Sequence, residues 1–175
     1  MKRIKKFAGY SLYILIILLL TLIIKGVALQ RTVVSGDSME HTLSDGDSLL
    51  VDKLTYRFRE PERFDVIVFP YSVSDKVYYV KRIIALPGET VQIREGVIMV
   101  DSHVLPYKYN RDVIMNAGVA STEITLNDHE YFVMGDNVND SVDSRSYDVG
   151  NIDRSMIIGK VFLRLRPFKK FGVIE

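Results

Sequence analysis

The feature that most constrains this chain is a long uncharged run near its N-terminus. Eighteen consecutive residues, 7–24, carry no charge, and residues 14–20 are wholly aliphatic. A helix over this run is roughly 27 Å long, and extending it to residue 29 carries it past the ~30 Å hydrocarbon core of a bilayer. Basic residues at positions 2, 3, 5 and 6 precede the run, and the positive-inside rule places them in the cytoplasm. The sequence therefore predicts a cytoplasmic N-terminus (1–6), a single transmembrane anchor (7–29) and an extracytoplasmic domain (30–175).

Two other interpretations of the run remain open. Gly26, Val27 and Ala28 end it in small residues at a spacing that suits a cleaved secretory signal. A buried core helix is the third interpretation. Because the run exceeds the core of about 7–15 residues that is usual in signal peptides, its length favours the uncleaved anchor.

Composition limits what the remainder of the chain can be. Residues 31–175 contain 18 basic and 22 acidic residues, a net charge of −4, so they show no nucleic-acid-binding footprint. Cysteine is absent, which excludes disulfides, zinc–thiolate sites and cysteine nucleophiles. Hydrophobic residues make up 47% of the chain and charged residues 26%, as expected of a packed globular domain.

Beyond residue 29 the pattern changes from helical to strand-like. Short β-branched or apolar runs are separated by turn signals, Glu95-Gly96 joins two of them as a tight hairpin, and no long amphipathic helix intervenes. The sequence therefore predicts a mainly β domain of antiparallel sheets. Residues 106–125 are polar and irregular, and we expect a surface excursion there. The strand candidates are 32–34, 48–54, 64–69, 77–86, 90–94, 97–100, 130–134 and 157–165.

A serine beside a glycine is the first candidate for chemistry. Ser38 lies in the segment Ser35-Gly36-Asp37-Ser38-Met39, directly after a short strand. A turn here can present a hydroxyl together with backbone N–H groups, as a nucleophile with an oxyanion hole requires. Gly-Asp-Ser is also common turn chemistry, and taken alone the segment favours that structural interpretation.

A lysine within an apolar strand is the second candidate. The two-residue period of a strand puts Lys81 on one face with Tyr79 and Ile83, and Arg82 on the other. A lysine on an apolar face must extend its amine to solvent, find a partner or lose its proton. A neutral lysine can act as a general base if its pKa falls from ~10.4 to near 7, a shift that burial can supply. The alternative is a lysine that protects an edge strand from aggregation.

A polar loop after a strand is the third candidate. It contains Ser141, Asp143 and Arg145, and it can orient a catalytic amine by hydrogen bonds, with the carboxylate and guanidinium paired as a brace. A calcium loop is the alternative, although the spacing does not match an EF-hand.

The three histidines suit neither a catalytic triad nor a metal site. His41 is only three residues from Ser38, and His103 and His129 lie in turn-like segments. Metal-ligand spacing is lacking as well. We expect solvated or capping histidines, and we expect no metal and no cofactor.

These three segments, in this order behind a basic start and an anchor, resemble bacterial type I signal peptidases. That family comprises membrane-bound serine proteases that cut signal peptides from exported proteins, and the single anchor here is similar to its compact Gram-positive members. The resemblance implies that Ser38 is the nucleophile, that Lys81 is the general base and that Ser141 holds the lysine amine. The oxyanion-forming or supporting residues that it implies are Gly36, Asp37, Met39, Ser141, Asp143 and Arg145.

The resemblance also implies a substrate and partners. The substrate is a preprotein with small residues, often alanine, at the first and third positions before the cut. The partners implied are signal peptides and the lipid bilayer, with the protein translocation machinery as a further candidate and no nucleic acid. The fold implied is a mainly β catalytic domain at the outer face of the cell membrane.

The sequence departs from the family pattern at four positions. The family usually has proline where His41 stands, aspartate where Glu89 stands and arginine where Val138 stands. Some members offer a serine hydroxyl to the oxyanion at the position of Gly36, so here the hole would rest on backbone N–H groups.

Two rival functions remain open. One is a membrane-anchored relative that has lost catalysis and acts as a binding or regulatory protein. The other is a self-cleaving repressor-type Ser-Lys protease, which would carry a DNA-binding domain where this chain has an apolar anchor.

Overall fold

The structure is a computed structural model that describes residues 13–19, 21, 28–72, 77–109 and 112–174. Residues 13–19 are helical, and their side chains, from Tyr13 to Leu19, are 46–65% exposed. Among the described residues, no helix has the length and apolar character needed to cross a membrane. The predicted N-terminus (1–6) and most of the predicted anchor (7–29) lie outside the described residues.

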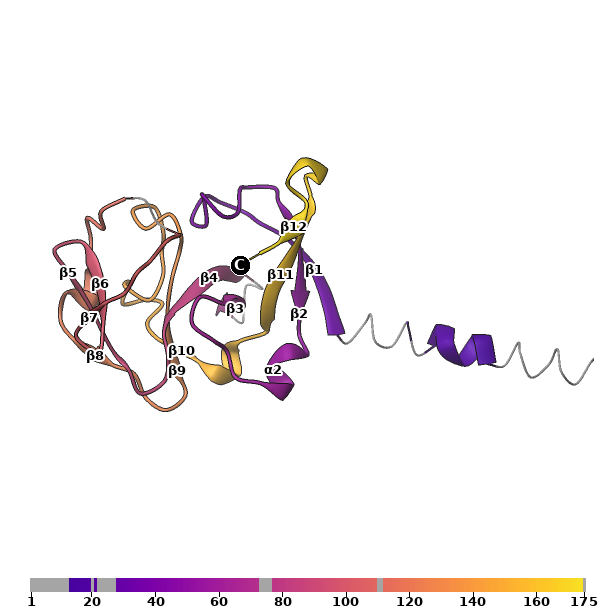
Figure 1. The fold of residues 1–175 in the computed structure, drawn as a ribbon, viewed down its shortest axis with the longest axis horizontal. Coiled ribbons are helices and arrows are strands. Elements are labelled where there is room, and N and C mark those ends of the chain that lie inside the picture. The colour runs from indigo at the N-terminus through magenta and orange to yellow at the C-terminus, as the bar shows by residue number, and fades with distance from the viewer. Residues whose placement is uncertain (1–12, 20, 22–27, 73–76, 110–111, 175) are drawn as a thin grey trace, which may run out of the picture.

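The larger of two antiparallel sheets carries the proposed chemistry (Figure 1). Its strand order is β1-β2-β11-β3-β4-β9-β10, with β12 paired to β11. The strands are β1 (Leu29–Val33), β2 (Ser48–Asp52), β3 (Val66–Ser72), β4 (Val77–Ala85), β9 (Glu130–Met134), β10 (Ile152–Asp153), β11 (Gly159–Arg166) and β12 (Gly172–Val173).

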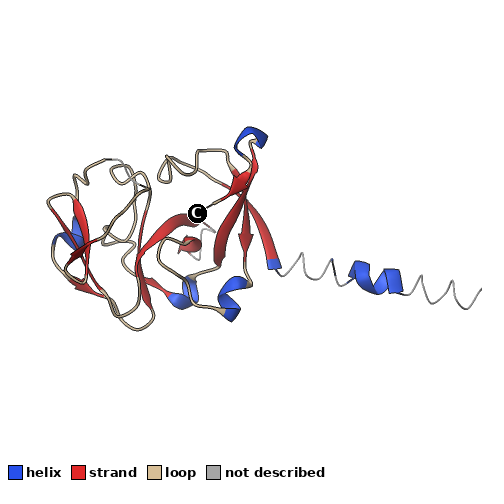
Figure 2. Ribbon diagram, viewed as in Figure 1, coloured by secondary structure: helices blue, strands red, loops and turns tan. Residues whose placement is uncertain are grey.

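The smaller sheet packs beside β4 and β9 and has the order β7-β6-β5-β8 (Figure 2). Its strands are β5 (Thr90–Arg94), β6 (Val97–Val100), β7 (His103–Val104) and β8 (Ile124–Thr125). Glu95 and Gly96 connect β5 to β6 with φ values of 53° and 77°. Positive φ at both central residues is the geometry of a tight hairpin turn, which confirms the predicted hairpin. The helical elements are α2 (Thr55–Phe58) and the 3-10 turns η1 (Gly118–Ser121), η2 (Arg154–Met156) and η3 (Phe168–Lys170).

Three clusters of buried apolar side chains hold these elements together. The cluster that positions the site packs Met39 and Leu43, from the loop after β1, against strand residues that include Val51, Val68 and Val161. Met39 is 1% exposed and Leu43 is fully buried. Because burial of an aliphatic side chain contributes about 1.5–3 kcal/mol, these two residues fasten the Ser38 loop to the sheet.

The mainly β prediction is confirmed, and the eight predicted strand regions all contain strands. The prediction of a surface excursion at 106–125 is wrong in part, because Ile114 is 6% exposed and Ala120 is fully buried in the core of the smaller sheet. The sequence did not indicate this burial, because single apolar side chains in irregular backbone can fill a core without any periodic pattern. The two-residue strands β7, β8, β10 and β12 were not predicted for the same reason.

Candidate active site

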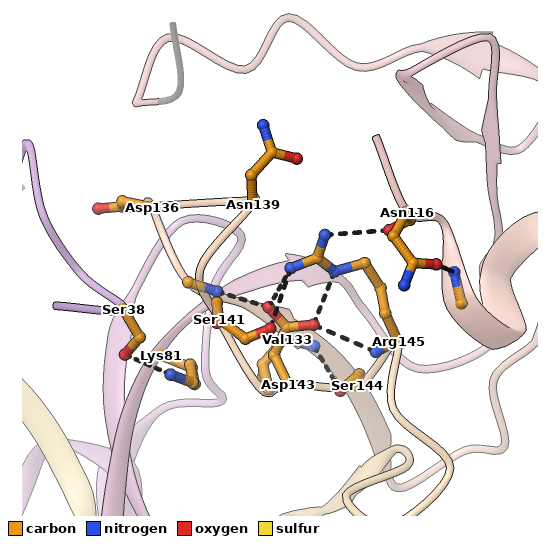
Figure 3. Close-up of polar contacts among 12 residues, drawn as sticks. Ser38, Lys81, Asn116, Val133, Asp136, Asn139, Ser141, Asp143, Ser144 and Arg145 are labelled. Atoms are coloured by element: carbon orange, nitrogen blue, oxygen red, sulfur yellow. Dashed lines mark hydrogen bonds and ion pairs between the residues drawn. The ribbon is translucent and has the colours of Figure 1, made fainter. Parts of the chain in front are cut away.

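Ser38 and Lys81 meet across 43 residues of sequence (Figure 3). Lys81 Nζ donates a hydrogen bond of 2.5 Å to Ser38 Oγ. Ser38 belongs to the loop after β1, and Lys81 lies in the middle of β4. With a neutral amine the same contact reverses, so that the serine hydroxyl donates to the nitrogen lone pair. The pair therefore has the geometry of a nucleophile beside a general base.

Lys81 is buried although one edge of its strand is open beside it. β3 pairs with β4 at Lys81, whereas β9 pairs with β4 only from Arg82 onward. The interpretation of Lys81 as a lysine that protects an edge strand is wrong, because its side chain is buried and its amine bonds to Ser38. The side chain is 3% exposed, and burial lowers the pKa of its amine from 10.5 to about 8. Asp143 opposes this lowering of the pKa, while Arg145 adds to it. The Tyr79 ring centroid lies 5.2 Å from Nζ, on the strand face that the sequence predicted.

The loop that carries Ser38 has a fixed backbone. The Gly36 N–H donates to Asp45 Oδ1 at 2.9 Å, and Gly36 has a φ of +92°, which favours glycine over any residue with a Cβ. The Asn137 N–H donates to the Ser38 carbonyl oxygen at 3.1 Å, and the Asn137 side chain donates to the Asp37 carbonyl oxygen. Within the described residues the Ser38 N–H makes no hydrogen bond, so it remains available as an oxyanion donor.

Asp143 and Arg145 form the brace that the sequence predicted. Arg145 Nε and Nη2 each donate to the Asp143 carboxylate at 2.8 Å, and the carboxylate is fully buried. The Gly135 N–H also donates to Asp143 at 3.0 Å. Arg145 extends further, with Nη1 donating to the Asn116 carbonyl oxygen and Nη2 to that of Ser141. The brace thus joins the loop after β9 to its own beginning at Gly135. Figure 3 shows the paired side chains of Asp143 and Arg145.

Ser141 lies close to the dyad without bonding to it. Its Oγ is buried and makes no hydrogen bond with any described residue. Among the described residues, Lys81 Nζ therefore donates a hydrogen bond to Ser38 and not to Ser141. Gly135 allows this close packing, because a Cβ there would lie 2.2 Å from the Ser38 carbonyl oxygen and 2.4 Å from Ser141 Oγ. Any side chain at position 135 would push the serine loop and the brace loop apart.

A buried ion pair on the other face of β4 was not predicted. Arg82 Nε and Nη2 donate to Asp136 at 2.9 and 2.8 Å, and both side chains are fully buried. Thr42 Oγ1 and Tyr107 OH also donate to the Asp136 carboxylate, at 2.5 and 2.6 Å. This network ties together the strand of Lys81, the loop of Ser38 and the Gly135 junction. The sequence did offer a signal for this ion pair, because Arg82 is next to Lys81 and Asp136 is next to Gly135.

A cleft of about 280 Å³ opens at the dyad. It is lined by the end of β1, by the Ser38 loop, by β4 from Tyr78 to Lys81, and by Asp140 and Val142. β1 is an edge strand, and β9 pairs with β4 only from Arg82 onward, so no described strand pairs with the Tyr78–Lys81 edge on that side. An extended peptide can therefore add to the sheet in this cleft as a further strand.

The structure shows the surroundings of His41, Glu89 and Val138, three positions at which the sequence departs from the family pattern. His41 has a φ of 80°, a conformation that proline cannot adopt. Glu89 accepts the Leu86 N–H at 2.7 Å and pairs with Arg63, and Val138 is buried at 2% exposure. All three histidines are exposed, and the described part of the chain contains no cluster of side chains that could hold a metal ion.

The serine, the buried lysine and the brace thus lie together beside one cleft of the larger sheet. A family model described as "Signal peptidase, peptidase S26" matches residues 7–166. The chain belongs to this family, which confirms the resemblance inferred from the sequence.

The curated relatives include proteins named signal peptidase I. "Signal peptidase I T" from Bacillus subtilis is 32% identical over 176 residues, which cover 97% of this chain and 90% of the relative. "Probable signal peptidase I-2" from Synechocystis is 30% identical over 131 residues, 72% of this chain and 58% of the relative's length, so the match spans less than two thirds of that protein. A crystal structure of a signal peptidase I from Enterococcus faecalis aligns with a TM-score of 0.47 at 30% identity, over 58% of this chain and 97% of the other.

Proposed function

We propose that this chain is a membrane-bound serine endopeptidase that removes N-terminal signal peptides from exported preproteins. The observation that carries the proposal is the 2.5 Å contact between Lys81 Nζ and Ser38 Oγ. Membership of the signal peptidase family and the names of the relatives support the reaction and the substrate class.

In the proposed reaction, neutral Lys81 takes the hydroxyl proton as Ser38 Oγ attacks the scissile carbonyl carbon. Backbone donors, chiefly the Ser38 N–H, hold the oxyanion, and one such donor is worth roughly 3 kcal/mol. Lys81 then gives the proton to the leaving amine, and the acyl-enzyme is hydrolysed by a water that the neutral amine activates. The fall of the Lys81 pKa from 10.5 to about 8 raises the neutral fraction at pH 7 about 300-fold.

The supporting residues act by position. Gly36, Asp37 and Met39 shape the turn that presents the Ser38 hydroxyl and N–H. Asp143 and Arg145 hold the loop that carries Ser141, whose buried and unbonded Oγ is a ready acceptor for the lysine amine when the amine turns away from Ser38. We expect the amine to move toward Ser141 once Ser38 is acylated, because the serine oxygen then has no proton that it could donate to the amine.

The proposed substrate enters the cleft as an extended strand with small residues at the first and third positions before the cut. We assign residues 7–27 to a single membrane span with a cytoplasmic N-terminus, two residues shorter than the sequence predicts, because Ala28 and Leu29 already bond to the folded domain. The catalytic domain outside then begins at residue 28. Only eight residues separate Leu29 from Ser38, and this segment reaches about 30 Å when extended. The nucleophile is therefore tethered near the membrane surface, where a signal peptide leaves the translocation machinery.

The test is cleavage of a purified preprotein by the full chain in detergent, followed across a pH series. Ser38→Ala and Lys81→Met are the test variants. Ser121→Ala and Lys108→Met make the same changes at exposed positions and serve as matched controls. We expect cleavage after a small-x-small site, loss of cleavage in both test variants alone, and a rate that rises with pH through about 8 as Lys81 loses its proton.

Two results would overturn this proposal. A folded wild type that cuts no preprotein would leave a binding relative without catalysis. Cleavage that survives Lys81→Met would require a different base, and His41, three residues from the nucleophile, would be examined first.

A further inference from the structure

A second pocket, of about 340 Å³, lies next to the dyad cleft. Asp140 and Val142 line the dyad cleft, whereas Ser141 and Val142 line the second pocket. Residues 140–142 therefore form a ridge, one chain segment wide, between the cleft and the second pocket. In the view of Figure 3, Ser141 on this ridge lies between the dyad and Asn116, which also lines the second pocket.

The walls of the second pocket are mainly apolar and amide in character. Met115 is 86% exposed and Val142 is 52% exposed, while Val138 lines the pocket at 2% exposure. Of the described residues that line it, none is an aspartate or a glutamate, and the single cation is Arg145, which is paired with Asp143. The family usually has arginine where Val138 stands, so this chain places an apolar side chain where a charge is usual. The pocket therefore suits an apolar side chain.

Hydrogen bonds hold the two sides of the second pocket together. The Met115 N–H donates to Asn139 Oδ1 at 3.0 Å, and the Asn139 side chain donates to the Val113 carbonyl oxygen at 3.0 Å. From the other side, Arg145 Nη1 donates to the Asn116 carbonyl oxygen at 3.2 Å. The segment that carries Met115 is thus bonded to the loop that carries the ridge, so the pocket is formed before any ligand binds.

The sheet geometry directs a bound peptide from the cleft toward this pocket. A peptide that pairs with residues 78–81 of β4 must leave the sheet at Lys81, because β9 occupies that edge from Arg82, which pairs with Met134. In the proposed function the residues before the cut fill the cleft, so the residues after the cut cross the ridge. Neighbouring chain segments lie about 4.8 Å apart and a strand advances about 3.3 Å per residue, so the crossing takes about two residues.

We propose that the second pocket binds an apolar side chain at the second or third position after the cut, and so selects preproteins by the start of their mature part. The inference rests on the proposed function and adds a specificity-determining contact to it. Met115 and Val142 lose contact with water when a substrate side chain covers them, which favours an apolar partner. An acidic side chain would instead pass Asp140 on the ridge and meet no unpaired cation among the described pocket residues.

The experiment compares kcat/KM of the full chain in detergent for preproteins that differ at one position after the cut. Leucine, serine, aspartate or lysine is placed at the second, the third or the sixth position. We expect leucine to exceed serine about tenfold at the second or third position, and no difference at the sixth. Met115→Ser and Val142→Ser should each reduce this preference. Val104→Ser is the matched control, because Val104 is 61% exposed in β7 and lines neither the cleft nor the second pocket.

A charge placed in the pocket should change the preferred substrate. Met115→Lys should raise kcat/KM for the aspartate substrate about threefold and lower it for the lysine substrate by the same factor, as expected of an exposed ion pair. Both effects should fall as salt is raised. Val138→Arg should act in the same direction, with circular dichroism to check its fold. Because Met115 is exposed, Met115→Lys tests the inference even if Val138→Arg does not fold. Val104→Lys should change neither substrate.

The outcomes separate this inference from the proposed function. A wild type that cuts none of the preproteins contradicts the proposed function, and this inference with it. Cleavage of all substrates with equal kcat/KM for leucine and serine at the second and third positions contradicts the inference alone. A leucine preference that survives Met115→Ser and Val142→Ser, or that changes equally in Val104→Ser, also contradicts it.

Discussion

Replacing Lys81 with methionine should abolish cleavage and at the same time stabilise the folded domain. The amine is 3% exposed, and its pKa falls from 10.5 to about 8 because burial disfavours the charged form. At neutral pH the folded protein therefore holds a cation in a place that disfavours cations. Methionine has a similar length and no charge, so it removes this cost while it keeps most of the packing.

The magnitude follows from linkage between proton binding and folding. A difference of 2.5 pKa units between the unfolded and folded chain corresponds to about 3 kcal/mol at a pH below both values. Loss of the hydrogen bond to Ser38 offsets about 1 kcal/mol. We expect the free energy of unfolding of Lys81→Met to exceed that of the wild type by about 2 kcal/mol at pH 7, a rise in Tm of roughly 4–8 °C.

The pH dependence identifies the cause. Between pH 8 and 10.5 the unfolded chain binds more protons at Lys81 than the folded chain, so the stability of the wild type rises with pH across this window. The advantage of the variant should therefore be full below pH 8 and gone near pH 10.5. Unfolding curves of the full chain in one detergent, at both ends of the window, measure this, with the exposed Lys108→Met as the control. A variant that is less stable at pH 7, or a difference that does not change with pH, would refute the reasoning.

Three further perturbations test the surroundings of the dyad. Gly135→Ala places a Cβ 2.2 Å from the Ser38 carbonyl oxygen, so we expect kcat to fall at least 100-fold in a steady-state peptide assay while circular dichroism stays that of the wild type. Asp143→Asn leaves the Arg145 guanidinium without its buried partner, which should lower the free energy of unfolding by about 3–5 kcal/mol in urea titration. It also removes a charge that raises the pKa of the lysine, so any remaining activity should rise at lower pH than in the wild type. His41→Gly relieves a φ of 80° and should raise the free energy of unfolding by about 1 kcal/mol, a gain that is absent if the loop already relaxes in solution.

The parts of the site that the sequence made predictable are those set by local period and local pairing. Strand period two placed Lys81 with Tyr79, and a spacing of two residues allowed Asp143 to pair with Arg145, as the structure confirms. Sequence could not show which strands lie beside β4. The burial of Lys81 depends on what packs around that strand, because an amine left in water would keep its ordinary pKa.

Long-range partners were hidden for the same physical reason. Asp136 is bonded by Arg82, Thr42 and Tyr107, at separations of 54, 94 and 29 residues. The sequence around an aspartate does not show which distant arginine will pair with its carboxylate. Tyr107 in particular lies in the stretch that was expected to be a surface excursion, and only the packing of the two sheets brings its hydroxyl to the buried ion pair.

The brace explains how a buried lysine can sit beside a carboxylate and still have a low pKa. Asp143 alone would raise the pKa of Lys81, and a lysine held in its charged form is no base. Arg145, bonded to the same carboxylate at 2.8 Å, acts on the Lys81 pKa in the opposite direction. The two members of the pair therefore have opposite effects on the pKa of the Lys81 amine. Burial is the largest cause of the lowered pKa. The Asp143–Arg145 pair has no net charge. It can therefore hold the backbone at Gly135 and Ser141 in place without stabilising the protonated form of Lys81.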